Sequence, residues 1–497
     1  MSTTLESTGQ PVTVRSRWSP DDVPADVVPE RYRLGEAFIP KGRYLDPEFQ
    51  QLELDKLFPR TWLMACRVEE LPGVGSYVEY RIDKHSILIV RESADSIRAY
   101  YNACRHRGTR LATGRGRVGS IICPFHGWRW NLDGSIRLVL DQEEFVDRSD
   151  EDLGLQGVRA ELWGGFVFIN LDPDAEPLLD YLDPIPTVFA PFQLENMRYR
   201  WMKGVTVPCN WKTVLDGFLE AYHVPGTHPQ LGRWDKSNHN LATLKELDRR
   251  PWSPTTIHGK FATYASLGPK KNTESIFDTT NGPIDDAEHE ELGKDPANKH
   301  IEGANDERRS IADAVQYIAR DMRALETERS ARVAEELRTA DVPDGMSVGQ
   351  YYMQMLREQS IADGLDWPVI SGKEWAAAGT AWHVFPNTIL LPNQGCIIGY
   401  RARPNGPDPD SCLFEAFSLE LIPVADYDRK ITDFEPQYFD DHRDADVGEV
   451  LTQDLDNSEN VTIGMHSPSF DGHRLSTAQE MTIYNHHRAA DHYLWTD

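Results

Sequence analysis

Four residues that can bind metal lie in two short segments of the chain, and they constrain its fold more than any other feature. Cys104 and His106 form one pair, and Cys123 and His126 form a second pair after sixteen intervening residues. Two loops must therefore lie side by side if all four residues are to hold one metal group. The flanking stretches SYVEYRI, HSILIVRE, IRAYYNA and GFVFINL are short, rich in β-branched and aromatic residues, and separated by Gly, Asp and Asn. The sequence predicts a compact all-β domain with the four residues on its loops.

Two cysteines and two histidines can hold either a zinc ion or an iron–sulfur cluster. Zinc fingers usually place both cysteines in one pair and both histidines in another, whereas each segment here offers one of each. This arrangement suits a Rieske-type [2Fe–2S] cluster, in which one iron takes both cysteines and the other takes both imidazoles. Gly108 and Gly127 follow the two histidines and let backbone N–H groups approach the sulfides. We therefore predict a cluster on Cys104, His106, Cys123 and His126, with zinc as the alternative.

The segment between the two pairs matches the glycine pattern of dinucleotide-binding loops at Gly114, Gly116 and Gly119. Such a loop must follow a strand and open a helix within a βαβ unit. Here the predicted cluster ligands lie a few residues away on either side, so we reject a nucleotide site. Because the chain has no other flavin or NAD fingerprint, any NAD(P)H must act through a partner protein.

A second candidate metal site lies in the sequence from Asn210 to His228. The pattern predicts a helix over Asn210–Val224 that stops at Pro225, and on it Glu220 and His223 share one face. The turn after the helix could bring His228 back toward His223. Two imidazoles and one carboxylate form the facial triad of non-haem iron(II) oxygenases. Taken singly, each histidine also has an ordinary hydrogen-bonded role as its alternative.

Both motifs resemble those of one family. The string CRHRGTRL…CPFHGWRWNLDG closely resembles the Rieske domain of aromatic-ring-hydroxylating oxygenases, and EAYHVPGTH resembles the mononuclear-iron motif of Rieske non-haem iron oxygenase α subunits. The resemblance covers roughly residues 45–240 and 375–495. It implies an α+β protein with an N-terminal arm (1–45), an all-β Rieske domain with a preceding helix (46–175) and a helix-grip catalytic domain (176–497), in which a curved antiparallel sheet surrounds a long helix.

The resemblance also implies roles for individual residues. Asp454 matches the third iron ligand, after His223 and His228, and Asp456 is its competitor. Glu220 matches the acidic bridge that carries an electron from a neighbouring subunit's cluster to the iron. Glu at this position, in place of Asp, slightly favours a monooxygenase or dealkylase. A strand that resembles the substrate-pocket strand of the family contains His383, Phe385 and Asn387.

The implied function is that of a terminal oxygenase. A reductase, a ferredoxin or both would pass electrons from NAD(P)H through the [2Fe–2S] cluster to Fe(II), where O₂ reacts with a small organic substrate, expected to be aromatic. Hydroxylation, cis-dihydroxylation and oxidative dealkylation all remain open, as part of aromatic hydrocarbon catabolism. The assembly implied is a homotrimer, with or without a small β subunit. The alternative is a Rieske electron-transfer protein without oxygenase activity.

Composition excludes several other classes. The net charge of −27 disfavours nucleic acid as a partner, and the chain contains no apolar run long enough to cross a membrane. The six cysteines are too few for a disulfide framework, and no signal peptide precedes them, so we expect a cytoplasmic protein.

Three smaller expectations concern surfaces. A charged segment at about 265–365 is expected to be a helical insertion. Histidines near the C-terminal end are expected at the surface; they are His466, His486, His487 and His492. An arginine-rich patch beside the cluster could dock an acidic electron donor or be ordinary loop charge; its members are Arg105, Arg107, Arg110, Arg115 and Arg117.

Overall fold

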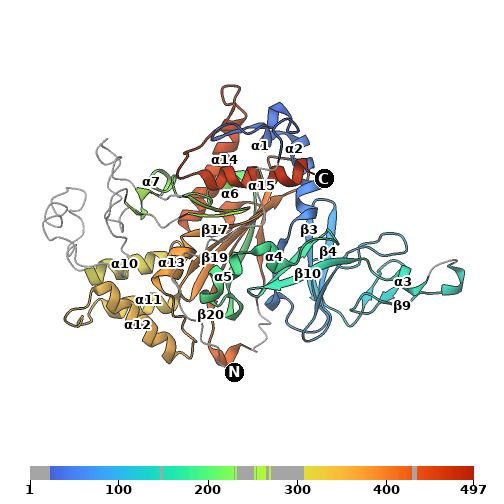
Figure 1. Cartoon of the computed structure of the whole chain (residues 1–497). Helices are drawn as coiled ribbons and strands as arrows, with labels where there is room; N and C mark the ends of the chain where they lie inside the picture. Colours follow the sequence, from blue (N-terminus) through green and yellow to red (C-terminus); the bar gives the residue numbers. More distant parts are fainter. Residues whose placement is uncertain are drawn as a thin grey trace, which may run out of the picture.

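The computed structural model describes residues 23–145, 149–228, 230–231, 251–252, 255–264, 268–269, 307–427 and 434–496. A large antiparallel sheet lies at the centre of the molecule, with an all-β lobe on one side and a group of helices on the other (Figure 1). This arrangement confirms the predicted α+β fold with an N-terminal Rieske-like domain and a sheet-and-helix catalytic domain. Among the described residues, no helix is long and apolar enough to cross a membrane.

The all-β lobe contains two sheets. The larger has the strand order β2-β11-β10-β5-β4-β3-β6, and the smaller has the order β7-β8-β9. Adjacent strands are antiparallel, and the first long hairpin pairs Tyr77 with Val90. The bounds of the larger sheet are β2 (Leu63–Arg67), β3 (Ser76–Ile82), β4 (His85–Arg91), β5 (Ile97–Tyr101), β6 (Arg115–Arg117), β10 (Gly157–Trp163) and β11 (Phe166–Asn170). Those of the smaller sheet are β7 (Ile121–Ile122), β8 (Arg129–Trp130) and β9 (Ile136–Leu138).

The segment before this lobe packs against the opposite end of the chain. Strand β1 (Phe38–Pro40) pairs with β22 (Gly472–Arg474), and Tyr32 and Tyr44 are buried. Residues 28–45 are therefore part of the folded body, which differs from the arm expected there; residues 1–22 lie outside the described part. The helix predicted after Asp46 is present as α2 (Pro47–Leu52), the π-turn η3 (Glu53–Leu57) and η4 (Phe58–Arg60), following α1 (Gly42–Leu45).

The catalytic domain is built on an eight-stranded sheet of order β14-β15-β17-β18-β19-β20-β12-β21. All pairs are antiparallel except β12 with β21. Every residue of β19 is buried, because the all-β lobe covers part of the sheet and helices cover the other face. The strands are β12 (Met197–Val207), β14 (Thr255–His258), β15 (Phe261–Tyr264), β17 (Ala381–Val384), β18 (Thr388–Asn393), β19 (Cys396–Pro404), β20 (Cys412–Leu421) and β21 (Gln437–Phe439).

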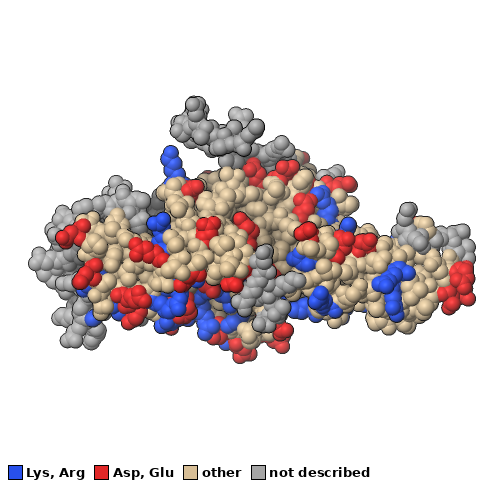
Figure 2. Space-filling view, turned by 90° about the horizontal axis from the view of Figure 1, so that it is seen from below, with Lys and Arg blue, Asp and Glu red and all other residues tan. Residues whose placement is uncertain are grey.

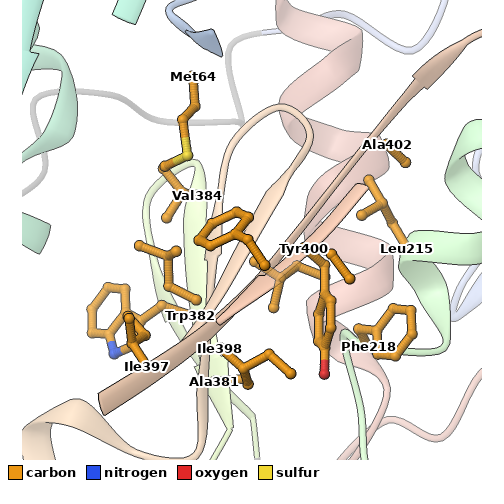
Figure 3. Close-up of a cluster of buried hydrophobic side chains, with 14 of the residues drawn as sticks. Met64, Leu215, Phe218, Ala381, Trp382, Val384, Ile397, Ile398, Tyr400 and Ala402 are labelled. Atoms are coloured by element: carbon orange, nitrogen blue, oxygen red, sulfur yellow. The ribbon is translucent and has the colours of Figure 1, made fainter. Parts of the chain in front are cut away.

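Three helices position the candidate iron ligands against this sheet. Helix α6 (Trp211–Asp216) packs on β19 and β20, α14 (Glu449–Met465) packs on α6, and the C-terminal α15 (Met481–Trp495) packs on β14 and β15 (Figure 1). Leu215 of α6 and Phe218, two residues after the helix, lie in the same buried cluster as Tyr400 of β19 (Figure 3). The same buried cluster includes Met64 of β2, so one core joins the two domains.

The predicted helical insertion is present in its second half. It contains α10 (Glu307–Arg320), α11 (Glu328–Leu337) and α12 (Val348–Ala362), followed by α13 (Gly372–Ala378). Ala314 and Val315 of α10 are buried, as the helical spacing of apolar residues indicated. Residues 270–306 of the expected insertion lie outside the described residues. The domains are joined by α4 (Leu178–Leu182) and α5 (Ile185–Phe189).

Candidate metal centres

The four residues of the first motif lie on two loops with the same backbone pattern. The Cys104 N–H donates to the Thr109 carbonyl (2.8 Å), and the Cys123 N–H donates to the Trp128 carbonyl (2.8 Å). Gly108 and Gly127 each close their turn at positive φ (+75° and +70°), a region that glycine adopts without strain. The loops meet so that the rings of His106 and His126 are 4.7 Å apart.

The donor set at these loops fits a Rieske cluster. Cys104 and Cys123 are buried, and the two thiols lie within hydrogen-bonding reach of each other. Burial raises the pKa of the Cys104 thiol. Burial also opposes ionisation of Cys123, but the backbone N–H groups of His126 and Phe125 outweigh this effect and lower the pKa of the Cys123 thiol. His106 Nδ1 is buried and has no hydrogen-bond partner, as expected of an atom that ligates iron.

Aromatic rings enclose one side of this centre. The Trp128 ring stacks on His106 at 4.9 Å and 8°, and Phe145 contacts both rings edge-on. On the other side, Phe125 contacts His126 but is 58% exposed. The centre is therefore shielded on the His106 side and accessible on the His126 side, where an electron can be exchanged with another protein surface.

The helix predicted over Asn210–Val224 is shorter than expected. Asn210 caps α6 by accepting a hydrogen bond from the Lys212 N–H, but α6 ends at Asp216, directly before Gly217. Pro225 does not end the helix. It lies in the first turn of a separate short helix, α7 (Val224–Thr227), where its missing N–H is not needed.

The break in the helix places the two histidines at the two ends of α7. His223 is its N-cap and His228 its C-cap, so both lie next to backbone turns. Glu220 Oε2 accepts a hydrogen bond from the His223 N–H (3.0 Å), a contact that takes the place of a helical hydrogen bond. Glu220 and His223 are thus neighbours, as predicted, although they do not share a regular helix.

His223, His228 and Asp454 converge on one point, although Asp454 is more than 200 positions away on α14. Each offers one ligand atom, and these atoms lie within 4.8 Å of one another. Asp454 Oδ1 is 2.9 Å from His228 Nε2 and 3.5 Å from His223 Nε2. Ligand atoms about 2.1 Å from one metal ion at right angles lie about 3 Å apart, so this spacing fits a single ion.

The competing carboxylate, Asp456, points elsewhere. Its Oδ1 lies 2.8 Å from His442 Nε2, and Arg443 and Glu459 belong to the same group. Although His442, Asp456 and Glu459 also form a possible ligand group, the Arg443 guanidinium already pairs with both carboxylates. Between the two predicted alternatives, Asp454 is therefore the one that the fold brings to the histidines.

The outer nitrogens of both histidines are held by acceptors. His223 Nδ1 lies 2.7 Å from Glu220 Oε1, and His228 Nδ1 lies 2.7 Å from Gln453 Oε1, which also accepts from Gln230. Both Nδ1 atoms are thus donors, which leaves each Nε2 bare toward the shared point. Burial disfavours a charged His223, but the Glu220 contact outweighs it and raises the pKa. His228 Nε2 is buried without a hydrogen bond, as suits a metal ligand.

Two tyrosines lie near the convergence point, and one of them, Tyr400, belongs to a cluster of aromatic rings. The ring of Phe218 lies 4.3 Å from that of Tyr400 (Figure 3). It also lies 5.6 Å from the ring of Phe414. Burial raises the pKa of Tyr264 and Tyr400, and the charge of Asp454 raises both further, so these rings lie near the carboxylate. These buried aromatic residues make the side of the site next to Asp454 apolar.

The three predicted pocket residues lie on and just after β17. His383 Nε2 is 3.1 Å from the Pro386 carbonyl oxygen, Phe385 stacks on Tyr493, and Asn387 donates to the Ala402 carbonyl. Among the described residues, none of their hydrogen bonds or ring contacts involves the convergent histidines or Asp454. Their part in substrate binding stays a prediction.

The expectation that the C-terminal histidines lie at the surface is wrong for two of them. His486 and His487 are fully buried, because α15 packs between the sheet and α1, whereas His466 is exposed beside Asp410. Burial lowers the pKa of both buried imidazoles. Neutral histidine packs as an aromatic ring, and counting histidine as polar misses this.

Two family models match the chain. The model described as ring hydroxylating alpha subunit (catalytic domain) matches residues 192–495, and the Rieske [2Fe-2S] domain model matches residues 61–147. These matches assign a Rieske cluster, rather than zinc, to the first centre and non-haem iron to the second.

Relatives and solved structures agree with the family models. The glycine betaine monooxygenase oxygenase subunit of Chromohalobacter salexigens is 33% identical over 214 residues, 42% of this chain and 47% of that protein. The carnitine monooxygenase oxygenase subunit of Escherichia coli K12 is 32% identical over 234 residues, 45% of this chain and 63% of that protein. The chain thus spans about half the length of the curated relatives it matches.

Two solved structures share the fold. The quaternary ammonium Rieske monooxygenase CntA in complex with L-carnitine has a TM-score of 0.56 at 16% identity, over 91% of this chain and 94% of that one. Naphthalene 1,2-dioxygenase with indole bound has a TM-score of 0.58 at 18% identity, over 93% of this chain and 94% of that one.

Proposed function

Because the chain belongs to the ring-hydroxylating oxygenase α-subunit family, we propose that it is the terminal oxygenase of a system that oxidises a small organic substrate with O₂. The convergence of His223, His228 and Asp454 carries this proposal, since an electron-transfer protein has no need of a facial triad. When bound, the cluster supplies electrons and the Fe(II) site activates O₂ beside the substrate. Cys104, His106, Cys123 and His126 hold the cluster, and the triad holds the iron.

Glu220 is proposed as the bridge to a neighbouring subunit. One of its oxygens accepts from the His223 ring and the other from the His223 backbone, so it fixes the ring and keeps Nε2 available. Tyr222, beside it, is 42% exposed, which supports a protein contact at this place. In a homotrimer, the accessible His126 side of one cluster would reach Glu220 of the next copy.

The substrate that we propose is a quaternary ammonium compound rather than an aromatic hydrocarbon. The relatives are named as monooxygenases for glycine betaine, carnitine and choline, which favours neither the aromatic substrate nor the dihydroxylation that the sequence left open. The rings of Phe218, Tyr264 and Tyr400 support the proposal, because aromatic faces attract cations by about 0.5–2 kcal/mol.

The reaction proposed is oxidative demethylation. One oxygen atom of O₂ enters a methyl C–H bond, and the other leaves as water with two electrons and two protons. The hydroxymethyl group then loses formaldehyde through C–N cleavage, which leaves a tertiary amine. The enclosing aromatic residues keep bulk water away from the substrate, and Glu220 and Gln453 hold the histidine rings in place throughout.

Product analysis tests this function. The purified protein, with an NAD(P)H-dependent reductase, should convert a panel member such as glycine betaine or carnitine to the demethylated amine, with one formaldehyde per NAD(P)H. His223→Ala and Asp454→Ala should abolish the product and lower the iron content, while the visible spectrum of the cluster stays unchanged. Asp456→Ala is the matched control and should retain both product formation and the iron content. Full product formation by His223→Ala would overturn the facial triad, and a natural protein whose cluster is reduced but which yields no product with any panel member would favour the electron-transfer alternative.

A further inference from the structure

Asp216, the last residue of α6, is half-buried, and its carboxyl group belongs to a cluster of polar side chains that the reaction described above does not use. Its Oδ2 is 2.6 Å from Tyr44 Oη, and Tyr44 Oη is 2.9 Å from His487 Nε2. The other carboxylate oxygen, Oδ1, is buried and has no hydrogen-bond partner. A negative charge with one oxygen unpaired in such a place is costly, and a neutral acid avoids that cost.

The cations near Asp216 are already paired with other acids. From its own helix, the Lys212 ammonium binds Glu53 of η3 at 2.7 Å, and Arg43 of α1 binds Asp491 of α15 at 2.7 Å. No positive charge among the described neighbours is therefore left for Asp216.

Other neighbours favour the neutral acid further. Glu220 lies four residues after Asp216, and Glu480 directly precedes α15. The negative charges of these two residues both disfavour an ionised Asp216. The C-terminal end of α6 disfavours it as well, because a helix is negative at that end. Tyr44 and Lys212 act in the opposite direction, but burial dominates and raises the pKa of Asp216 to about 8.

We propose that Asp216 is a positioning residue that must carry a proton for Glu220 to remain on His223. The structure has the Tyr44 hydroxyl donating to Asp216 Oδ2. In the neutral form that we propose, the proton of the same 2.6 Å contact lies on Asp216, and the Tyr44 hydroxyl then donates to His487 Nε2. When the proton leaves for solvent at alkaline pH, Tyr44 reverses and donates to Asp216, and His487 Nε2–H donates to Tyr44. Asp216 and Glu220, four residues apart, then both carry a negative charge, and the repulsion between them draws Glu220 away from the His223 ring.

This inference rests on the proposed function in one respect, since Glu220 is the proposed bridge. Loss of the Glu220–His223 contact would stop electron delivery to the iron site, so reductase-driven turnover should fall as pH rises through about 8. Asp216→Asn keeps the shape of the neutral acid and cannot ionise. It should stay active at neutral pH and lack the alkaline decline, with several-fold more turnover than the natural protein at pH 9. Asp180→Asn, an exposed change on α4, is the matched control and should keep the decline.

Two measurements on the holoenzyme need no turnover. In the natural protein, the infrared C=O band of protonated Asp216 should be present at pH 7 and lost by pH 9. In Asp216→Asn, the protonated-carboxyl signal at pH 7 should be smaller by one carboxyl group. Between about pH 4 and about pH 8, Asp216 is protonated in the folded protein and ionised in the unfolded chain. The free energy of unfolding that Asp216 contributes therefore falls as pH rises through this range. The Tm of Asp216→Asn relative to the natural protein should therefore rise across that range and level off above it.

Tyr44→Phe distinguishes the titration of Asp216 from a purely structural role of this residue. Tyr44 helps the ionised carboxylate by donating to it, so its removal should move the alkaline decline and the loss of the infrared band to higher pH. An unchanged decline in Asp216→Asn, or no loss of a carboxyl band in that variant, would overturn the inference. If no substrate is oxidised at any pH while the infrared and Tm results hold, the proposed function fails and the proton on Asp216 stands.

Discussion

Gln453, which precedes Asp454 in the sequence, holds the ring of His228 in place. Its amide oxygen accepts from His228 Nδ1, which fixes the ring so that Nε2 faces the iron site. Partners of this kind change metal affinity about 10- to 100-fold when they are removed. We therefore expect Gln453→Ala to weaken binding of Fe(II), or of Co(II) under air, by about that factor. Competition with a coloured chelator measures it.

Gln453→Glu is the matched control for this prediction. A carboxylate still accepts from His228 Nδ1 and from the Gln230 amide, so metal affinity should return to within a few-fold of the natural protein. If Gln453→Ala binds metal as tightly as the natural protein, packing alone holds His228. Equal weakening by Ala and Glu would show that the acceptor is not what matters.

The sequence predicted the residue types at the second centre better than it predicted their supports. Motif spacing indicated His223 and His228, and the family resemblance favoured Asp454 over Asp456; the fold brings the first three together. Nothing in the sequence marks Gln453, Tyr44 or Asp216, because their partners come from elements far along the chain. Such contacts follow from the way helices pack, which local patterns do not encode.

The segment that carries the two histidines shows the same limit of prediction from local sequence. The apolar spacing at 210–224 predicts one helix, yet Gly217 and the side-chain bond from Glu220 to the His223 N–H end it early. Local hydrogen bonds of this kind compete with helical ones. The break is useful, since it places His223 and His228 at the two ends of the short helix α7.

Helix α14, which carries Asp454, begins at a backbone position that only glycine fits. Gly448 has φ +96°, and a Cβ there would overlap the Met322 carbonyl oxygen at the end of the α10 segment. We expect Gly448→Ala to lower the free energy of unfolding by about 1–3 kcal/mol and to loosen the start of α14. Urea unfolding followed by circular dichroism measures the change, and iron content reports on Asp454.

Gly464, in the last turn of the same helix, supplies the comparison. A Cβ there meets nothing within 4 Å, and the residue does not have positive φ. Gly464→Ala should therefore leave stability unchanged or raise it by up to about 1 kcal/mol. A similar loss in both variants would mean that α14 tolerates no change anywhere, and the backbone argument for Gly448 would fail.

The cluster loops carry a basic surface that is unusual for a chain of net charge −27. One patch of Lys and Arg lies on the narrow lobe, whose tip carries Asp and Glu, and red and blue are mixed over the rest of that face (Figure 2). Arg110 and Arg115 pair with Glu79 and Glu70, but Arg107 lies over the ring of Phe125. An acidic electron donor would use Arg107, so Arg107→Gln and rising ionic strength should both lower reductase-dependent kcat/KM. A flat salt response contradicts this docking.

At the scale of the whole molecule, a buried ion pair joins the Rieske and catalytic domains. Arg401 of β19 donates from Nε to Glu415 Oε2 (2.6 Å) and from Nη1 to the carbonyls of Met64 (2.9 Å) and Ala65 (2.8 Å) in β2. Arg403 also pairs with Glu415. One carboxylate thus neutralises two guanidinium groups, and one of these holds the edge of the other domain.

Glu415→Gln should therefore destabilise the whole chain. It leaves two buried cations without a counter-charge, and breaking a buried pair in this way costs about 3–5 kcal/mol. Glu420→Gln, on the half-buried part of the same strand, should change stability by less than about 0.5 kcal/mol. Calorimetry of both variants measures the difference, and because the pair spans both domains, a single transition should shift as a whole. A loss confined to one of two separate transitions would show that Arg401 does not couple the domains.

The same pair predicts how stability depends on acid. Burial alone would raise the pKa of Glu415, but Arg401 and Arg403 outweigh it and lower the pKa to about 2. A carboxyl with a lowered pKa contributes stability that is complete above its unfolded pKa of about 4.5 and is lost as pH falls toward 2. The natural protein should thus lose Tm steeply between pH 4.5 and 2, and Glu415→Gln should lose less over that range. Parallel curves for the two proteins would mean that other carboxyls, and not this domain contact, set the acid limit of the fold.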